Sequence, residues 1–340
     1  GTNPANFTQD DKQYVIEDDS SSTAAAWTVS GTNSKVIIET GIGFTVTNGN
    51  TVTASIELEG TGAITIDDGT NPTLSVISST STVTYSTNAA SIETTTYGNL
   101  VIDKALSLSG DITVSGALTL NDVLTLDGNI LTLDGTIAGA STISGSNASD
   151  IIIGGTGALG TIQFTTGNEL LENLTINRTT SGTVTLGSDL TIGGATSGTG
   201  VLTLTDGSID LNGNTLSFSN SSTSIATGTI TGSNTAIIII NGTGTFGDGL
   251  AMDQTSAITR TLRTLDFDRL GQDIVLASDL TISNSMISRN GSCSIGANTL
   301  LLEGDYTSTS GDLKGTILSN LTINGLNPIT SAIVFDLGAN

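Results

Sequence analysis

Carboxylates are the side chains of this sequence with the widest scope for chemistry. Two pairs stand out, Asp67 and Asp68 in the segment IDDGTN and Asp266 and Asp268 in the segment LDFDR. Paired carboxylates can act as general acid and base, and their oxygen atoms are the ligands that Ca²⁺ prefers. Aspartate at a corner between strands more commonly hydrogen-bonds the turn backbone. We therefore expect a structural role for all four residues, no enzymatic activity and no cofactor, with Ca²⁺ binding as the alternative.

Other catalytic and metal-binding groups are scarce. The chain has no histidine and a single cysteine, Cys293. The usual nucleophile–base pairs, zinc sites and internal disulfides therefore lack their components. In the repeats described below, Cys293 aligns with Leu124 and Ile209. This alignment predicts a buried thiol that belongs to the apolar core.

Arginine is concentrated in one segment, TRTLRTLDFDRLG. It contains Arg260, Arg263 and Arg269, three of the five arginines of a chain with a net charge of −23. The segment predicts either a surface network with Asp266 and Asp268 or a contact with an acidic patch on a neighbouring subunit. Further interface candidates are aromatic or apolar residues near the two ends of the sequence: Tyr14, Trp27, Val334 and Phe335.

The overall charge limits the classes of partner. A net charge of −23 over 340 residues leaves no basic stripe of the kind that binding to a nucleic-acid backbone requires. No apolar run reaches membrane-spanning length, so membrane insertion is not expected either. Divalent cations are the partners that such a surface attracts, and the composition favours a secreted protein.

Short β-strands are the elements that must position these residues. In residues 118–135, LTLNDVLTLDGNILTLDG, leucine recurs at every second position within three short segments, with Thr, Asp and Asn between them. Alternation with a period of two places one set of side chains on one face. Val, Ile, Leu and Thr are abundant along the whole chain, whereas strong helix formers are scarce. The sequence therefore predicts an all-β fold with a thin aliphatic core.

Internal repeats indicate how the strands are arranged. Residues 142–160 and 229–247 match at 12 of 19 positions without a gap. Three further families recur at offsets near 85 residues, within which a period of about 20 is typical of one solenoid coil. The families are centred on Asp111, Asp189 and Asp279, on Asn129, Asn214 and Asn298, and on Asn99, Asn173 and Asn320.

These periods favour a parallel β-solenoid over its alternative, tandem β-sandwich domains. We expect an irregular N-terminal cap over residues 1–34 and a solenoid over residues 35–340, built from long repeats at about 99–172, 173–259 and 260–340. Strand pattern continues through the final segment SAIVFDLGAN, which predicts that another domain or another copy continues the stack. The residues predicted to form the core are Leu124, Leu126, Ile152, Ile209, Leu211, Ile239, Cys293 and Ile295.

Several segments resemble a known family. They are WTVSGTNSKVIIETGIGFTV, TNPTLSVISSTSTVTYS and YGNLVI, followed by ENLTINRTTSGTVTLGSDLTI and VLTLTDGSIDLNGNTLSFSN. Over most of residues 25–325 the chain is similar to the secreted surface proteins of Bacteroidota that leave by type IX secretion. The resemblance implies a right-handed β-solenoid, an extracellular location and a role as adhesin, stalk or matrix fibre. The sorting domain that ends such proteins is missing here, as in a cleaved product or a fragment.

Two functions are consistent with these observations. The first is a structural one, in which the chain is a β-solenoid subunit of a cell-surface filament, fibre or adhesin stalk and associates end to end. The second is that of a carbohydrate-binding or polysaccharide-degrading β-helix, with a cell-surface or matrix glycan as partner. The second function requires aromatic and acidic residues to converge in one groove, and aromatic residues make up only 4% of this chain.

Overall fold

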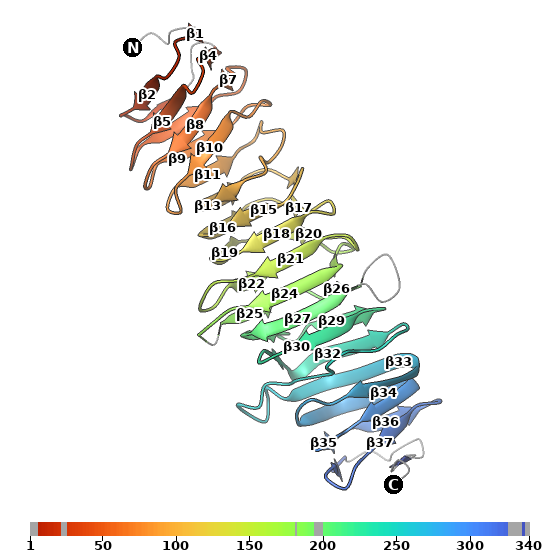
Figure 1. Ribbon diagram of the computed structural model, residues 1–340. Helices are drawn as coiled ribbons and strands as arrows, with labels where there is room; N and C mark the ends of the chain where they lie inside the picture. The colour runs from red at the N-terminus through yellow and green to blue at the C-terminus, as the bar shows by residue number, and fades with distance from the viewer. Residues whose placement is uncertain (1–5, 22–25, 181, 194–199, 326–334, 337–340) are drawn as a thin grey trace. The chain divides into compact units, whose positions relative to one another are not determined.

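The computed structural model describes residues 6–21, 26–180, 182–193, 200–325 and 335–336. These residues form strands, turns and bends, without a helix. The chain divides into two compact units, Gly1–Ser144 and Gly145–Asn340. In each unit short strands follow one another around successive coils, and each strand pairs with the strand one coil later (Figure 1).

The first unit contains five runs of paired strands, of which the run β1-β4-β7 lies nearest its start. Their orders are β1-β4-β7, β10-β8-β5-β2, β19-β16-β13-β11-β9-β6-β3, β12-β15-β18 and β14-β17-β20. The strands are β1 (Asn6–Phe7), β2 (Gln13–Ile16), β3 (Ser20–Ser21), β4 (Trp27–Val29), β5 (Lys35–Ile38), β6 (Gly43–Val46), β7 (Val52–Thr53), β8 (Ser55–Leu58), β9 (Ala63–Ile66), β10 (Thr73–Ile77), β11 (Thr82–Tyr85), β12 (Thr96–Tyr97), β13 (Asn99–Ile102), β14 (Leu106–Ser107), β15 (Ile112–Val114), β16 (Ala117–Leu120), β17 (Leu124–Thr125), β18 (Ile130–Leu133), β19 (Thr136–Gly139) and β20 (Ile143–Ser144).

The second unit has the same construction with longer strands towards its C-terminal side. Its orders are β21-β24-β27-β30, β22-β25-β28-β31 and β23-β26-β29-β32-β33-β34-β35-β38, with β36 and β37 also paired to β34 and β39 paired to β37. The strands are β21 (Asp150–Ile153), β22 (Gly160–Ile162), β23 (Leu170–Leu171), β24 (Asn173–Asn177), β25 (Thr183–Leu186), β26 (Leu190–Ile192), β27 (Val201–Asp206), β28 (Ser208–Asp210), β29 (Thr215–Ser219), β30 (Ser222–Ile225), β31 (Thr229–Thr231), β32 (Ser233–Asn241), β33 (Thr261–Val275), β34 (Leu280–Ser294), β35 (Thr299–Leu302), β36 (Asp305–Ser308), β37 (Asp312–Lys314), β38 (Asn320–Ile323) and β39 (Phe335–Asp336).

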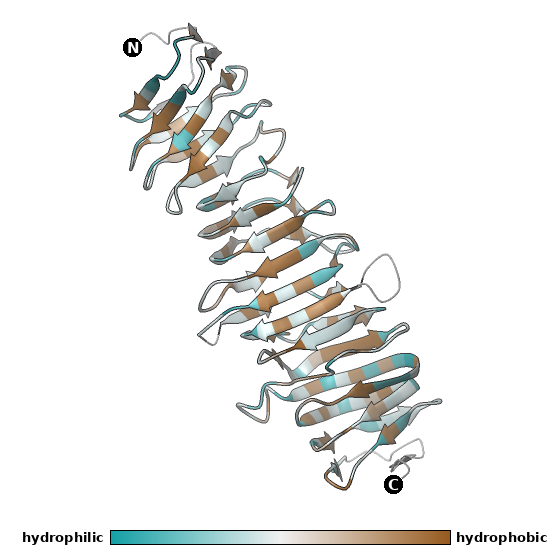
Figure 2. Ribbon diagram, in the orientation of Figure 1, coloured by the Kyte–Doolittle hydropathy of each residue, from teal (hydrophilic) through white to brown (hydrophobic). Residues whose placement is uncertain are grey.

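Parallel pairing in register aligns like side chains from coil to coil. In the first unit one buried column runs through Phe44, Ile64, Val83, Leu100 and Leu118, all in successive parallel strands. In the second unit hydropathy alternates along β27 and β33 (Figure 2), because every second side chain faces the interior of the coil. These columns confirm the predicted all-β solenoid and exclude separate sandwich domains.

The interior of the coils contains six of the eight predicted core residues. Leu124, Leu126, Ile209, Leu211, Cys293 and Ile295 are all buried. The predictions for Ile152 and Ile239 are wrong: Ile152 is 38% exposed and Ile239 is only half-buried. Each lies in a run of consecutive isoleucines, in which a period of two buries the neighbours and turns the residue between them outward. Ile151 and Ile153 are the buried residues of the first run, and Ile238 and Ile240 those of the second.

The corners between strands use left-handed backbone conformations. Asp127, Asn212 and Gly296 occupy matching corners of three coils with φ values of 53°, 49° and 64°. Glycine adopts this conformation freely, and Asn and Asp tolerate it better than other residues because a short polar side chain can bond locally. The Asn, Asp and Gly of the repeat are therefore required by the turn itself.

The described part of the predicted N-terminal cap already belongs to the parallel ladders. β1 pairs in parallel with β4, and β2 pairs in parallel with β5. A capping function for this segment and the three boundaries of the long repeats stay predictions.

Candidate functional site: polar side chains between coils

An aspartate and an asparagine join neighbouring coils in a fixed arrangement, which we call the Asp–Asn clamp. In its first copy, Asp111 Oδ1 accepts a hydrogen bond of 2.8 Å from the amide N of Ile130, one coil later. Asn129, the residue before Ile130, donates from Nδ2 to the carbonyl of Leu108 in the earlier coil (3.2 Å) and to the carbonyl of Leu126 in its own corner (2.9 Å). The two side chains thus supply partners for backbone groups that the corner leaves outside the ladder.

The second unit contains two further copies of the clamp. Each copy has the same hydrogen bonds. The aspartate always lies three residues after the residue of the earlier coil whose carbonyl accepts from the asparagine. The contacts are Asp189–Thr215 N (2.8 Å), Asn214–Leu186 O (2.9 Å) and Asn214–Leu211 O (3.1 Å) in one copy, and Asp279–Thr299 N (2.7 Å), Asn298–Leu276 O (2.6 Å) and Asn298–Ile295 O (3.3 Å) in the other. Two of the sequence families, those of Asp111 and Asn129, are therefore the two halves of one clamp.

A buried arginine fills the inside of each of two Gly-Thr-Gly loops. Arg178 is 1% exposed and donates from Nε to Gly157 O (2.7 Å), from Nη1 to Gly154 O (2.5 Å) and from Nη2 to Thr156 O (2.7 Å). The planar guanidinium has donors in a fixed fork, and the loop turns three carbonyl oxygens towards them. Arg178 therefore fixes the shape of the loop at residues 154–157.

Arg269 has the equivalent position in the other copy of the repeat. It is 0% exposed and donates from Nε to Asn241 O (3.4 Å), from Nη1 to Gly244 O (3.2 Å) and from Nη2 to Ser221 O. Its guanidinium carbon lies 5.3 Å from the centre of the Phe246 ring. Burial lowers the pKa of Arg269, because removal from water disfavours the charged form.

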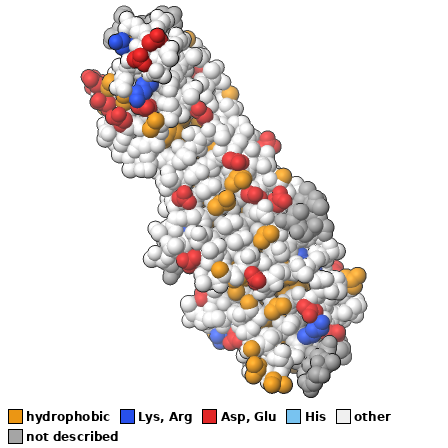
Figure 3. Space-filling model, in the orientation of Figure 1, with side chains coloured by type: hydrophobic (Ala, Val, Ile, Leu, Met, Phe, Trp, Pro, Cys, Tyr) orange, Lys and Arg blue, Asp and Glu red, His pale blue; other side chains and the backbone are white. Residues whose placement is uncertain are grey.

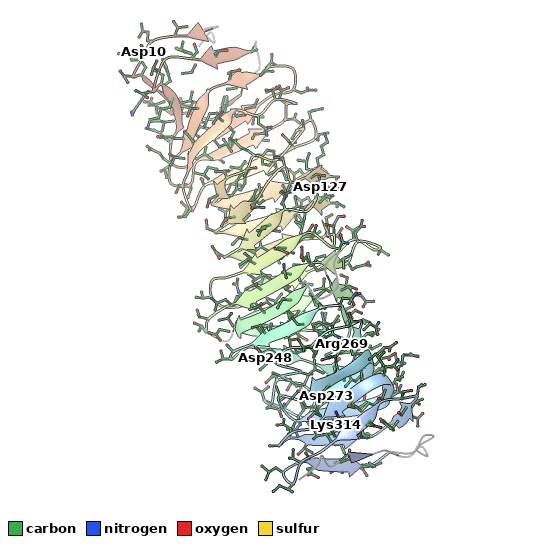
Figure 4. All side chains as sticks on the ribbon, turned by 45° about the vertical axis from the view of Figure 1, so that its right-hand side comes forward. Asp10, Asp127, Asp248, Arg269, Asp273 and Lys314 are labelled. Atoms are coloured by element: carbon green, nitrogen blue, oxygen red, sulfur yellow. The ribbon has the colours of Figure 1, made fainter. Side chains whose placement is uncertain are left out.

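These contacts correct the expectation for the arginine segment. Arg269 is not an interface residue, and its partners are carbonyl oxygens instead of Asp266 and Asp268. Arg263 is exposed and Arg260 is half-buried, so both stay candidates for an interface. Figure 4 labels Arg269, and it also labels Asp273 and Lys314, which form an ion pair of 2.8 Å on the surface.

The carboxylates considered for Ca²⁺ already have protein partners. Asp67 Oδ1 accepts hydrogen bonds from the backbone N and from Nδ2 of Asn88, both at 3.0 Å. Asp266 forms a two-point ion pair with Arg289 (2.9 and 2.8 Å), and Asp268 accepts from Nδ2 of Asn290 (2.6 Å). The second pair of carboxylates is thus partly neutralised by a cation, which opposes Ca²⁺ at the same oxygens.

Asp68 is the most enclosed of the four carboxylates. It accepts from Gly49 N (3.1 Å) and from Thr51 Oγ1 (3.0 Å). Burial alone would raise its pKa, but hydrogen bonds from the backbone of Gly49, Gly69 and Thr70 and from the Thr51 hydroxyl together lower the pKa of this carboxyl below its usual value. No group of three or more potential metal ligands occurs among the residues that the structure describes.

The thiol of Cys293 has the position that the repeats predicted. It is buried in β34, in register between Ile274 of β33 and Leu313 of β37. Burial, together with the charge of Asp273, raises the pKa of the Cys293 thiol to about 12. The residue is therefore an apolar core group and a poor nucleophile.

Large aromatic side chains are also inside the coils. Tyr85 and Tyr97 are buried, with their hydroxyl oxygens 2.9 Å apart, and the Tyr97 hydroxyl donates to Glu93 O (2.5 Å). Burial raises the pKa of Tyr85 to about 12 and raises that of Tyr97 further. The Glu93 carboxylate accepts from Leu74 N, at the edge of β10. These rings stabilise the interior and leave no exposed platform for a sugar at this point.

The remaining interface candidates are placed only in part. Tyr14 is half-buried in β2, and its ring centre lies 4.2 Å from that of Phe7. Trp27 lies in β4 and Phe335 in β39. Val334 lies outside the described residues. On the face shown in Figure 3, acidic side chains gather over the first strands of the first unit.

The sequence pattern assigned no role to Arg178, although it follows the first Gly-Thr-Gly loop by one coil, as Arg269 follows the second. It also assigned no role to Lys104, whose Nζ donates to the carbonyl of Ala89. The Asp and Asn of the clamp were recognised as recurring positions, but only the structure shows that one family bonds the other.

No helix in the described part of the chain is long and apolar enough to cross a bilayer. Comparison of the chain with protein-family models, with curated proteins and with solved structures gives no match.

Proposed function

We propose that the chain is a structural protein, a β-solenoid of a cell-surface filament, fibre or adhesin stalk. The observation that carries this proposal is that polar side chains of the chain form hydrogen bonds between neighbouring coils. The Asp–Asn clamp occurs three times among the residues that the structure describes, and each of its bonds to the earlier coil is a contact that must break before the coils separate. Two buried arginines hold the loops of the second unit in the same way.

The energetics of the coils support the same function. Each coil contributes aliphatic side chains to shared columns, and removing one buried leucine from such a column costs about 2–5 kcal/mol. Parallel ladders in register also connect each coil with two neighbours. A solenoid of this kind resists local opening and keeps its length, which are the properties that a stalk requires.

End-to-end association is part of the proposal. A parallel ladder can be extended by any strand that matches its register, so a second copy can add its own coils to an open edge. The high negative charge opposes lateral contacts between copies and keeps single fibres apart. The extracellular location is proposed from the acidic composition and from the resemblance to secreted surface proteins.

Sedimentation and electron microscopy of the purified chain test this proposal. We expect fibres whose length increases with protein concentration, and whose formation is favoured by salt or Ca²⁺ because both screen the acidic surface. Particles that stay monomeric at every concentration, with and without Ca²⁺, would contradict the association.

A further inference from the structure

A groove in the first unit is lined by one lysine, one aspartate and several hydroxyl side chains. It has a volume of about 590 Å³ and lies over β14 and β17, within the range of about 300–1,000 Å³ that is typical of ligand sites. Six lining residues matter for the argument: Ser91, Lys104, Ala105, Ser107, Thr125 and Asp127. Figure 4 labels Asp127 at the corner that follows β17.

Lys104 is the one basic residue among the described residues that line this groove, and a hydrogen bond holds its side chain in place. Its Nζ donates to the carbonyl of Ala89 at 2.8 Å, and the side chain is half-buried. An ammonium group has three donors, so two stay available to a ligand. Lys35 and Lys314 form ion pairs with carboxylates, but among the described residues no carboxylate pairs with Lys104.

The walls of the groove are fixed before any ligand arrives. Asn71 Nδ2 donates to Ser91 O at 2.8 Å, and Ser109 Oγ donates to Ile92 O at 3.1 Å. The clamp asparagine, Asn129, holds the carbonyl of Leu108 in the floor. A site of this kind does not need to be ordered by the ligand, which removes one cost of binding.

We propose that this groove binds a uronic-acid unit of an acidic polysaccharide. The ligand carboxylate pairs with Lys104 and takes the place that a protein carboxylate has beside Lys35 and Lys314. The hydroxyls of Ser91, Ser107 and Thr125 donate hydrogen bonds to the ring hydroxyls or accept from them, and the carboxylate of Asp127 accepts from a ring hydroxyl. The Ala105 methyl group and the Lys104 stem contact the apolar face of the ring. One cation together with several hydroxyls suits a sugar acid, whereas a phosphodiester chain requires several cations.

This binding site goes beyond the proposed structural function. Its test measures ligand binding, whereas the test of the structural function measures fibre formation. Calorimetric titration uses the full chain in 0.15 M NaCl at pH 7 with tetragalacturonate, a neutral galactose oligomer of the same length, and dextran sulfate. At this ionic strength charges more than about 8 Å away are largely screened. We expect binding of tetragalacturonate alone, weakened about tenfold or more by Lys104→Met and unchanged by Lys12→Met, which removes an exposed lysine of the same unit.

A second pair of variants separates binding from folding. Ala105→Leu fills the groove without changing the charge and should abolish binding, whereas Ala138→Leu enlarges an exposed alanine on β19 and should not. Far-UV circular dichroism confirms that each variant is folded. The proposal is overturned if tetragalacturonate does not bind at millimolar concentration, if dextran sulfate binds equally well, or if Ala105→Leu retains the affinity. None of these results bears on fibre formation.

Discussion

Replacement of Arg269 by methionine is a demanding test of the role given to the buried arginines. Methionine retains most of the aliphatic stem and removes the guanidinium, so the carbonyl oxygens of Ser221 and Gly244 lose their donor, whereas that of Asn241 keeps the backbone N of Asn220 at 3.2 Å. A buried carbonyl without a partner costs about 1–3 kcal/mol. Two of them give roughly 2–6 kcal/mol, from which the cost of burying the guanidinium charge, absent in the variant, must be subtracted.

We therefore expect a net loss of about 2 kcal/mol in the stability of the second unit. With a urea dependence of about 2 kcal/mol per M, the midpoint of unfolding should fall by about 1 M. Hydrogen exchange measured by mass spectrometry on peptides from β32 and β33, over a series of urea concentrations, reports this midpoint without interference from the first unit.

Arg263→Met is the matched control, because Arg263 is exposed on the same strand. Its effect should be within about 0.5 kcal/mol of zero. Arg269→Lys retains the charge but not the planar fork, so it should also destabilise the unit. Equal midpoints for Arg269→Met and Arg263→Met would refute the reasoning, and a fully stable Arg269→Lys would show that charge alone is sufficient.

Three further predictions concern the clamp, the thiol and one carboxylate. Asn129→Ala removes the hydrogen bonds to the carbonyls of Leu108 and Leu126 and should lower the stability of the first unit by about 2 kcal/mol in urea titrations. Asn121→Ala, which removes an exposed contact, should cost less than about 1 kcal/mol. Cys293, with its thiol pKa raised by burial, should resist iodoacetamide at pH 8 until urea unfolds the second unit, and rapid labelling of the native chain would contradict its burial. Because folding lowers the pKa of Asp68, its carboxylate stabilises the fold at pH values above its pKa in the unfolded chain, and this stabilisation is lost as pH falls through its pKa in the folded chain. Between pH 6 and pH 3 the unmodified chain should therefore lose more stability than the Asp68→Asn variant loses, as measured by urea titration.

The fold was predictable because a solenoid repeats its signals. Alternating aliphatic residues gave the strands, and the recurrence of Asp111 and Asn129 at offsets near 85 gave the stacking. In a run of identical residues, the sequence did not predict which side chains face the core and which face outward. In the run around Ile152 all three side chains are apolar, so periodicity cannot tell which one faces out, and the answer depends on the register with β24.

The polar contacts were less accessible to sequence reasoning. Arg269 lies beside two aspartates in the sequence, which suggested an ion-pair network, but its neighbours in space come from two earlier coils. Arg178 and Lys104 have no other basic residue near them in the sequence. Their carbonyl partners, among them Gly157 O and Ala89 O, come close only when the coils stack. The contacts of Asp111 and Arg269 with other coils join residues between 19 and 48 positions apart, and no local pattern specifies which of these positions face each other.

Two aspartate variants at adjacent positions in β21 test most directly that the coils bury one shared aliphatic core. Ile151 is buried in register with Leu174 of β24, whereas Ile152 faces outward. Ile152→Asp should retain the native far-UV circular dichroism and melt within a few degrees of the unmodified chain, and Ile151→Asp should lose the cooperative unfolding of the second unit, because it buries an unpaired charge. Equal behaviour of the two variants, folded or unfolded, would contradict the account.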